Sequence, residues 1–529
     1  MSGVAIDGNG LDRAGIEAIA RGAHVTLCES LLSEVARGRQ QLDRAIEERQ
    51  RIYGVTTGYG PLAGRDVDPS RAGHLQRHLV YHLATGTGPA LPPVTVRAIM
   101  AVRLNTLAQC HSAVRPAVLE QLTAWLNADL VPMVPARGTV GASGDLTPLA
   151  HIALALIGEA EVWDGGVRCH ASDALERHGW TPLAPEAKDA LGLVNGTAAM
   201  TGIAAINAMA ASRAVDLAMR CTVAYAECMG GRVEAWHPGL GHVRPHPGQQ
   251  SAHAQLAALA ADSQRLITQG RDALPPEAEG GTGVLGEGPV PQDPYTVRCA
   301  PQVMGAVLDA LRYHDETVDR EINAVTDNPI FFPDEDMILQ GGNFYGQHVA
   351  FAADAATSAL VKLGVHAERC VARITDEARN GSLPAFLRGG ATGLNSGLMG
   401  AQVSASAIIA EMRSNAHPAA FQSVPTNADN QDVVSMGTIA ARKTADCLTH
   451  LRELQAITTI TMAQAVDHLG PDRFSASTLA LRNWVREVSA PLTDDRPLST
   501  DIQQIADRLA DPGGCTYAPE GHTADTPGI

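Results

Sequence analysis

The segment from Ala198 to about Cys228 has a helical pattern that is apolar on nearly every side, and it strongly limits the folds open to this chain. A helix without a polar face must be covered all round, which a bundle of helices achieves. The chain is rich in alanine and only 4% aromatic, a composition that favours helix. Further long helical segments are expected at about 301–326, 346–379 and 432–469. The sequence therefore predicts a mostly α-helical protein, a long-helix bundle that packs across subunits.

The overall charge and the cysteine usage limit the binding partners and the cellular compartment expected for this chain. A formal net charge of −17, without a dense cluster of lysine and arginine, argues against nucleic acid or a membrane surface as a partner. The N-terminal residues lack the features of a secretory signal, and the most apolar run, 198–211, is too short to span a bilayer. Nine scattered cysteines without a Cys-x-x-Cys pair favour free thiols. We expect a cytoplasmic protein.

A glycine-rich stretch at residues 138–149, Gly-Thr-Val-Gly-Ala-Ser-Gly-Asp-Leu-Thr-Pro-Leu, precedes an expected helix, with Thr147 as its cap and Pro148 in its first position. Within it, Ala142-Ser143-Gly144 could fold back so that the glycine nitrogen reaches the alanine carbonyl carbon, since glycine has no Cβ to clash. Loss of water on closure and dehydration of the serine would give a methylidene-imidazolone, an electrophile made of backbone. The alternative is an ordinary glycine turn before a capped helix.

Residues 53–61, Tyr-Gly-Val-Thr-Thr-Gly-Tyr-Gly-Pro, are predicted to form a loop, because their glycines, threonines and proline end the preceding helical pattern. Two tyrosines in a glycine-rich loop are typical of a lid with a polar tip. The alternative is a plain connector whose tyrosines pack against the core.

Asp68-Pro69 is expected to open the next helix, on which Leu75, Leu79 and His82 recur at helical spacing. This spacing places His82 on the apolar stripe, either as a satisfied core histidine or as a hydrogen-bonding group that faces a polar substrate tip. His78 lies four residues before it, a spacing that can hold a metal, but no third ligand is evident nearby.

Three loops carry polar side chains suited to a small-molecule site. In Asp293-Pro-Tyr-Thr-Val-Arg298 a phenol lies three residues before an arginine, whose fork matches both oxygens of a carboxylate. Amide side chains occur in the other two, at Asn323–Pro329 and at Asn430-Gln431. Each of these groups could equally bond to its own backbone. Sequence spacing does not show that the loops converge.

Two other patterns are not interpreted as sites. Gly281–Gly286 matches Gly-x-Gly-x-x-Gly, but it follows prolines rather than a strand, and no helix can open after it. His237, His242 and His246 could be metal ligands, but the prolines and arginine among them indicate a structural loop. We expect no metal.

Taken together, these stretches resemble one family. The motifs GTVGASGDLTPLAH, YGVTTGYG, LVNGT, YTVRCAPQ, NAVTDNP, GGNFYGQ and PTNADNQD all occur, in the family's order along the chain. The chain resembles the aromatic amino-acid ammonia-lyases and aminomutases that carry a self-made methylidene-imidazolone (MIO), the family of histidine, phenylalanine and tyrosine ammonia-lyases. The resemblance covers about residues 10–510.

The resemblance implies a mostly α-helical subunit in a homotetramer, with each site drawing on several chains. We expect residues 1–195 to form a smaller N-terminal domain with the lid and MIO loops, 196–470 a central long-helix bundle, and 471–529 a C-terminal helical segment with a frayed tail.

The resemblance also implies roles for the motif residues. Ala142, Ser143 and Gly144 would cyclise to MIO with no external cofactor, Tyr53 would remove a β-proton, and Arg298 would hold the substrate carboxylate. A tyrosine base near neutral pH needs nearby positive charge and hydrogen bonds to its phenolate oxygen. The other residues would steady the MIO oxygen and the reacting amine (Asn195 and Tyr295) or line the pocket (Gly60, Asn328, Phe344, Asn430 and Gln431).

Substrate choice is expected to rest on His82-Leu83, which looks like the pair of tyrosine-selective lyases, whereas phenylalanine lyases carry Phe-Leu and histidine lyases Ser-His. His82 could hydrogen-bond a para-hydroxyl, and a site built to bond that hydroxyl rejects the analogue without it. Gln431 also stands where histidine lyases carry a glutamate. The resemblance thus implies L-tyrosine as substrate and p-coumarate and ammonia as products.

Other outcomes stay open at this point. A tyrosine 2,3-aminomutase would use the same site and return the amine at Cβ to give β-tyrosine, depending on how long the lid stays closed. A phenylalanine ammonia-lyase and a catalytically silent helical scaffold are the remaining alternatives.

Overall fold

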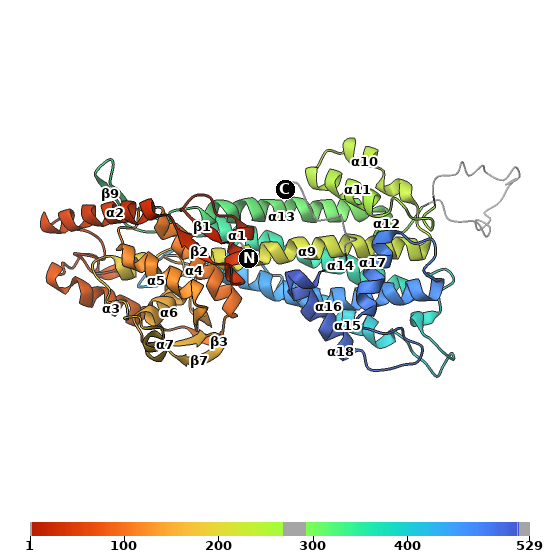
Figure 1. Cartoon of the computed structure of the whole chain (residues 1–529). Coiled ribbons are helices and arrows are strands. Elements are labelled where there is room, and N and C mark those ends of the chain that lie inside the picture. The colour runs from red at the N-terminus through yellow and green to blue at the C-terminus, as the bar shows by residue number, and fades with distance from the viewer. Residues whose placement is uncertain (1–2, 268–291, 516, 518–529) are drawn as a thin grey trace, which may run out of the picture. The chain divides into compact units, whose positions relative to one another are not determined.

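The computed structural model describes residues 3–267, 292–515 and 517, and it confirms a mostly helical chain (Figure 1). The long segments expected from the sequence are all helices: α9 (Ala198–Met229), α13 (Ala300–Ile322), α14 (Gln347–Ile374) and α16 (Gly437–Leu469). Apolar residues of all four share one buried hydrophobic cluster, which explains why these helices have so little polar surface. The Gly281–Gly286 pattern and most of the expected frayed tail lie outside the described residues.

The chain forms two compact units, each assembled from three stretches of sequence. Unit 1 contains residues 1–209, 313–355 and 418–445, and unit 2 contains 210–312, 356–417 and 446–529. Four of the five boundaries fall inside α9, α13, α14 and α16, so each unit holds part of every long helix, and the fifth follows residue 417, between α15 (Met399–Asn415) and α16. The division of the chain at residues 195 and 470 stays a prediction.

Unit 1 combines shorter helices with small sheets. Strand β4 pairs with β6, which pairs with β7, all antiparallel, while β1 and β2 run parallel. The helices are α1 (Arg13–Ala20), α2 (Glu29–Glu47), α3 (Ala72–Leu83), α4 (Pro93–Ala108), α5 (Pro116–Asn127), α6 (Leu146–Leu156), α7 (Ala171–His178) and α8 (Asp189–Val194). The strands are β1 (Val4–Ile6), β2 (Val25–Leu27), β3 (Thr87–Ala90), β4 (Leu130–Pro132), β5 (Pro135–Arg137), β6 (Glu161–Asp164), β7 (Val167–His170), β8 (Ile330–Phe332) and β9 (Met337–Leu339).

Helix α4 runs through the hydrophobic core of unit 1, and nearly all of its residues from Val96 onward are buried. Two of these buried residues are arginines, Arg97 and Arg103. Arginine is rarely buried without partners, so both need carbonyl or carboxylate oxygens inside the core.

Unit 2 holds the rest of the four long helices together with α10 (Pro238–His242), α11 (Pro247–Leu259), α12 (Tyr295–Arg298), α15 (Met399–Asn415), α17 (Ala476–Arg486) and α18 (Ser499–Ala510). His237 caps α10, because its Nδ1 accepts a hydrogen bond from Gly239 N at 3.1 Å. Among the described residues, no group of three or more His, Cys, Asp or Glu side chains is placed to hold a metal ion.

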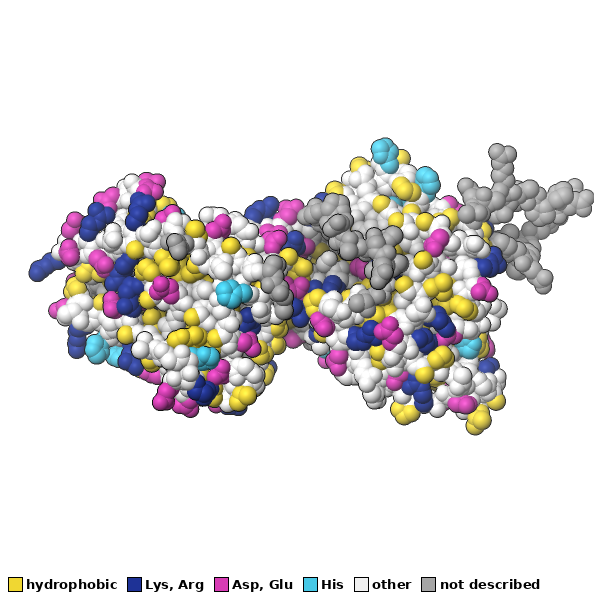
Figure 2. Space-filling model, in the orientation of Figure 1, with side chains coloured by type: hydrophobic (Ala, Val, Ile, Leu, Met, Phe, Trp, Pro, Cys, Tyr) yellow, Lys and Arg dark blue, Asp and Glu magenta, His cyan; other side chains and the backbone are white. Residues whose placement is uncertain are grey.

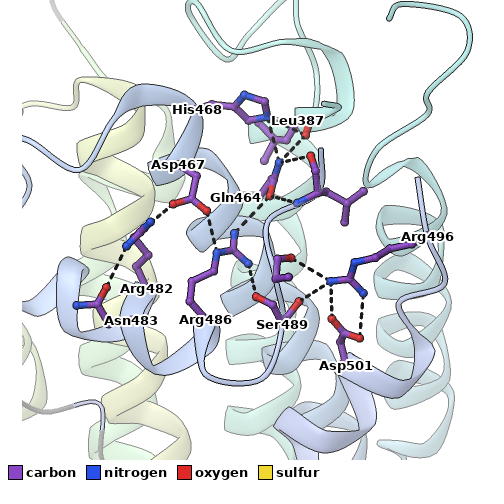
Figure 3. Close-up of polar contacts among 12 residues, drawn as sticks. Leu387, Gln464, Asp467, His468, Arg482, Asn483, Arg486, Ser489, Arg496 and Asp501 are labelled. Atoms are coloured by element: carbon purple, nitrogen blue, oxygen red, sulfur yellow. Dashed lines mark hydrogen bonds and ion pairs between the residues drawn. The ribbon is translucent and has the colours of Figure 1, made fainter. Parts of the chain in front are cut away.

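A polar network in unit 2 ties α16, α17 and α18 together (Figure 3). Asp467, near the end of α16, accepts hydrogen bonds from Arg482 and from Arg486 on α17, the second at 2.8 Å. Arg496 forms an ion pair with Asp501 of α18 at 2.7 Å. The C-terminal helices are therefore held by charged pairs as well as by apolar packing.

On the face drawn in Figure 2, acidic and basic side chains are interspersed. In the part of the chain that the structure describes, no helix is long and apolar enough to cross a membrane.

Candidate active site

The loop before α6 folds tightly around Ala142-Ser143-Gly144. Ala142 and Gly144 form a bridge between their backbones, so the tripeptide is doubled back on itself. Gly144 has φ of 70°, and a Cβ at this position would overlap the carbonyl oxygen of Gly196. Only glycine fits there without strain. The backbone of these three residues is therefore held in a folded-back turn.

Helix α6 begins earlier than the sequence predicts. Its N-cap residue is Asp145 and its first residue is Leu146, so the prediction that Thr147 caps the helix and that Pro148 opens it is wrong. Asp145 N donates to Gly196 O at 2.7 Å, and this tertiary contact fixes where the helix starts. Pro148 is tolerated because the first four N–H groups of a helix have no partner within it.

Residues far along the chain hold this loop in place. Met436 N donates to Val140 O at 2.9 Å, and the Ser435 hydroxyl donates to Gly141 O at 3.1 Å. Gly141 has φ of 73° and no room for a Cβ, which would overlap the Ser435 hydroxyl.

Two predicted site residues contact Ser143 directly. Asn195, the C-cap of α8, donates from Nδ2 to the Ser143 carbonyl oxygen at 3.0 Å. Gln431 donates from Nε2 to the Ser143 hydroxyl at 3.2 Å, while its Oε1 accepts from Thr426 at 2.7 Å. The structure therefore brings three of the predicted motifs together around one serine.

The expected lid is a loop over residues 53–59, which leads into a single 3-10 turn at Gly60–Leu62, and it contacts the Asn427–Gln431 segment. Gly60 N donates to the Tyr53 hydroxyl oxygen at 2.9 Å. A Cβ on Gly60, which has φ of 51°, would lie 2.6 Å from Asn427 Nδ2 and 3.8 Å from Asn430 Oδ1. Since Gln431 in the same segment contacts Ser143, the lid and the 142–144 loop border a common segment.

The second lid tyrosine has a different environment from the first. Tyr59 lies edge-on to Tyr53, with ring centroids 6.2 Å apart, and its hydroxyl accepts from Gln76 Nε2 at 3.0 Å. Burial raises the pKa of Tyr59, so this phenol stays protonated. Gln76 also accepts from Leu191 N at 2.9 Å, which ties the lid to α8.

The prediction that His82 lies on the apolar stripe of its helix is wrong. The buried residues of α3 are Ala72, Gln76, Leu79 and Val80, whereas His82 is exposed and Leu83 half-buried. The buried face is rotated because Gln76, whose amide is fully hydrogen-bonded inside, takes the place expected for Leu75. The His82 ring still lies near the lid, with its centroid 6.4 Å from that of Tyr59.

Asn328 is buried, and its Oδ1 accepts from Gly341 N at 2.8 Å. Phe344 is half-buried and precedes α14. Both belong to unit 1, with Ser143, Asn195 and Gln431.

Tyr295 and Arg298 belong to unit 2, where they form the two ends of α12. The Arg298 guanidinium carbon lies 4.7 Å from the centre of the Tyr295 ring, and Tyr295 is 68% exposed. Buried Arg298 Nε has no hydrogen-bond partner among the described residues. A helix of four residues is not stable on its own. It is held by hydrogen bonds from the side chains of Tyr225, Trp236 and His366 to Thr296 and Val297.

Two residues near the site were not assigned a role from the sequence. Gln76 could have been noticed as a polar residue beside a leucine pattern, but its burial depends on the lid. Asp145 is fully buried directly after the tripeptide, and it accepts hydrogen bonds from Thr438 and from Met200 N, the latter at 2.7 Å.

The Asp145 carboxyl predicts a pH dependence of stability. Burial raises its pKa from 3.8 to about 7, against the opposing effect of its hydrogen bonds. Between these values the native state keeps a proton that the unfolded state has lost, so stability falls as pH rises from about 4 to about 7. We expect Asp145→Asn to flatten the fall in Tm over this range, measured by calorimetry. Parallel curves for the wild type and the variant would contradict this assignment.

The comparisons with known proteins agree on the family to which the matched proteins belong. The family model described as aromatic amino acid lyase matches residues 11–487. The chain is 44% identical to a tyrosine ammonia-lyase of Cereibacter sphaeroides, over 92% of this chain and 94% of that protein. It is 39% identical to a histidine ammonia-lyase of Symbiobacterium thermophilum, over 93% and 94%. The fold matches the crystal structure of tyrosine aminomutase from Streptomyces globisporus with a TM-score of 0.91 and 37% identity, over 96% and 97% of the two chains. The chain belongs to the aromatic amino acid lyase family.

Proposed function

We propose that this protein removes ammonia from L-tyrosine without oxidation and gives p-coumarate. The observation that carries the proposal is the convergence of Asn195 and Gln431 on Ser143, in a loop that is folded back as cyclisation needs. The likeness to a tyrosine ammonia-lyase at 44% identity supports the choice of substrate.

The residues present fit an MIO group made from Ala142, Ser143 and Gly144, with no external cofactor. A tightly closed ring needs a residue without Cβ at position 144, where any Cβ would overlap Gly196. It also needs a donor to the Ser143 carbonyl oxygen, which the Asn195 amide provides. When formed, the group would supply an electrophilic carbon for the substrate amine, chemistry that would make the amine nitrogen a better leaving group. Intact mass spectrometry tests this part: the chain is expected to lack the mass of two waters, and a full mass would contradict it.

The chain's own residues would carry out the remaining steps. Tyr53 is proposed to remove the β-proton, and the Gly60 N–H at 2.9 Å stabilises negative charge on its oxygen. Arg298 would hold the substrate carboxylate, since both bond through planar forks. Asn195 and Tyr295 would steady the reacting groups, and the pocket would be lined by Gly60, Leu83, Asn328, Phe344, Asn430 and Gln431.

His82 is proposed to recognise the para-hydroxyl of the substrate. We expect His82→Phe to shift the ratio of kcat/KM for L-tyrosine over L-phenylalanine by at least about tenfold toward phenylalanine, because a lost hydrogen-bond partner penalises the hydroxyl. Exposed His78, one turn away on α3, offers His78→Phe as a matched control with unchanged selectivity. An unchanged ratio in the His82 variant would remove this residue from recognition, and a wild type that prefers phenylalanine would indicate a phenylalanine ammonia-lyase.

The second candidate is a tyrosine 2,3-aminomutase, favoured by the match to the tyrosine aminomutase structure. Chiral product analysis after incubation with L-tyrosine and no added cofactor distinguishes the two. p-Coumarate and ammonia without β-tyrosine support the lyase, whereas abundant β-tyrosine supports the aminomutase.

We further propose a homotetramer with shared sites, in the cytoplasm, where the cysteines stay reduced. All nine cysteines are free thiols. Large apolar side chains are exposed, including Phe351 at 53%, Val433 at 57% and Val403 at 61%, as is typical of subunit interfaces.

Shared sites predict complementation between inactive variants. Ser143→Ala changes unit 1 and Arg298→Ala changes unit 2. If each site takes these residues from different chains, co-expression should restore about a quarter of the wild-type sites in random tetramers. Activity assays of each variant alone and of the co-expressed pair test this. A co-expressed pair as inactive as the single variants would contradict shared sites.

A further inference from the structure

Three charged side chains meet in the core of unit 1, and none of them has a proposed catalytic role. Arg103 is 2% exposed, and Lys188 and Asp327 are completely buried. Lys188 Nζ donates to Asp327 Oδ2 at 2.6 Å, and Arg103 lies 3.9 Å from the same oxygen. The neighbouring carboxyl of Asp189 is paired with Arg115 instead. One carboxylate therefore serves two cations.

Stability does not explain this cluster. Burying charges costs free energy that a salt bridge often fails to return, and apolar residues of similar volume serve as well or better. Arg103 Nε has no hydrogen-bond partner among the described residues, and burial lowers the pKa of Arg103 to about 10. A buried group kept at such a cost is a candidate for a functional role.

The cluster holds the two segments that carry Asn195 and Asn328. Arg103 donates to Gly192 O in α8 and to Thr326 O at 3.2 Å. Lys188 is the N-cap residue of α8, the helix that ends at Asn195. Asp327 Oδ1 accepts from Asn328 N at 2.6 Å. Three side chains thus bridge a helix and a loop that are more than 120 residues apart in sequence.

In the packed core, a single residue, Gly196, separates Arg103 from the folded tripeptide. A Cβ on Gly196 would come within 2.5 Å of Arg103 Nη1, and the Gly196 carbonyl oxygen is the atom that a Cβ on Gly144 would overlap. From Arg103 the packing therefore runs through Gly196 to Gly144, and Asn195 next to it donates to Ser143 O.

We propose that Arg103, Lys188 and Asp327 form a positioning cluster, which fixes the amide of Asn195 against the Ser143 carbonyl and also holds the backbone of Asn328. The cluster acts through these asparagines and contacts no substrate. The proposal rests on the proposed function of the Ser143 loop.

The test compares two buried arginines of the same helix. Arg97 is 3% exposed and, like Arg103, donates to carbonyl oxygens, those of Ile19, Ala20 and Leu126, and it lies near one carboxylate, that of Asp129 at 3.0 Å. None of these partners belongs to the 138–145 loop or to residues 188–196. Arg103→Met and Arg97→Met therefore remove the same chemistry from similar surroundings. The full-length proteins are compared by Tm and by the fraction of chains whose mass lacks two waters, which we call matured chains. They are also compared by kcat on L-tyrosine per matured chain.

We expect both variants to lose stability, but only Arg103→Met to lower kcat per matured chain, by about 10- to 100-fold, as small displacements of reacting groups do. In an Asn195→Ala background the effect of Arg103→Met on kcat should shrink, because both changes disturb one interaction. Unchanged kcat in Arg103→Met, or effects that multiply fully with Asn195→Ala, would overturn the proposal.

Two further measurements keep the outcome clear. If Arg103→Met does not fold, Arg103→Lys and Arg97→Lys replace the pair: a lysine keeps the charge but reaches only one of the two carbonyls, so the same contrast in kcat is expected. Hydrogen exchange needs no turnover: Arg103→Met should accelerate exchange in residues 188–196 and 325–328, and Arg97→Met should not. If Arg103→Met accelerates exchange but the wild type is inactive and has its full mass, the proposed function is wrong and the cluster stands. If exchange in Arg103→Met is unchanged, the cluster proposal is wrong.

Discussion

Replacing Ser143 by alanine is expected to leave a folded chain with its full mass and to lower kcat on L-tyrosine on the order of 10⁴-fold or more, the scale at which loss of a covalent-catalysis group acts. Alanine has no hydroxyl to eliminate, so the methylidene carbon cannot form. The Asn195 bond to the carbonyl of residue 143 is made to backbone, so it survives the change. Intact mass and product assays on the purified variant check both expectations.

The control is Ser435→Ala, which removes a nearby hydroxyl that is bonded to Gly141 O but is not part of the tripeptide. This variant is expected to mature more slowly while still losing two waters. Turnover by Ser143→Ala at the wild-type rate would show that the electrophile does not come from this serine.

Replacing Tyr53 by phenylalanine is expected to lower kcat by about 10²- to 10⁴-fold, the usual contribution of a general base. The Tyr53 oxygen faces Gly60 N, and the ring packs against Tyr59, so phenylalanine can keep the packing and lose only the proton acceptor. The mass loss of two waters should be intact, because this residue acts on substrate rather than on the tripeptide.

The matched control is Tyr59→Phe, in the same lid. Its hydroxyl accepts from Gln76 and takes no proposed part in proton transfer, so the main effect should be on lid stability. Steady-state kinetics and a primary isotope effect with β-deuterated tyrosine distinguish the two variants. Equal losses of kcat in both would show that the lid needs both phenols for its shape alone.

The sequence predicts the parts of the site that depend on local backbone, because glycine patterns determine which turns are possible. The folded-back Ala142–Gly144 tripeptide and the loop at Tyr53–Gly60 follow from where a Cβ cannot fit. The four long helices follow from their apolar periodicity. The convergence of Asn195 and Gln431 on Ser143 was expected only from the family resemblance.

The remaining features depend on tertiary contacts that no spacing rule contains. His82 is displaced from the buried stripe because Gln76 finds partners on the lid and on α8. Arg103 and Lys188 look like ordinary solvated residues in the sequence, and their burial becomes sensible only beside Asp327. Helix α6 starts early because Gly196 supplies an acceptor to Asp145 N.

The sequence separation within unit 1 has a consequence for how the protein is made. The 138–145 loop is completed by Ser435 and Thr438, 294 and 293 positions later in the chain. The ribosome delivers the N-terminal residues first, so the nascent loop must wait, with its apolar neighbours uncovered, until most of the chain has been translated. A chain that ends before residue 435 would lack the Ser435, Met436 and Thr438 contacts that hold this loop.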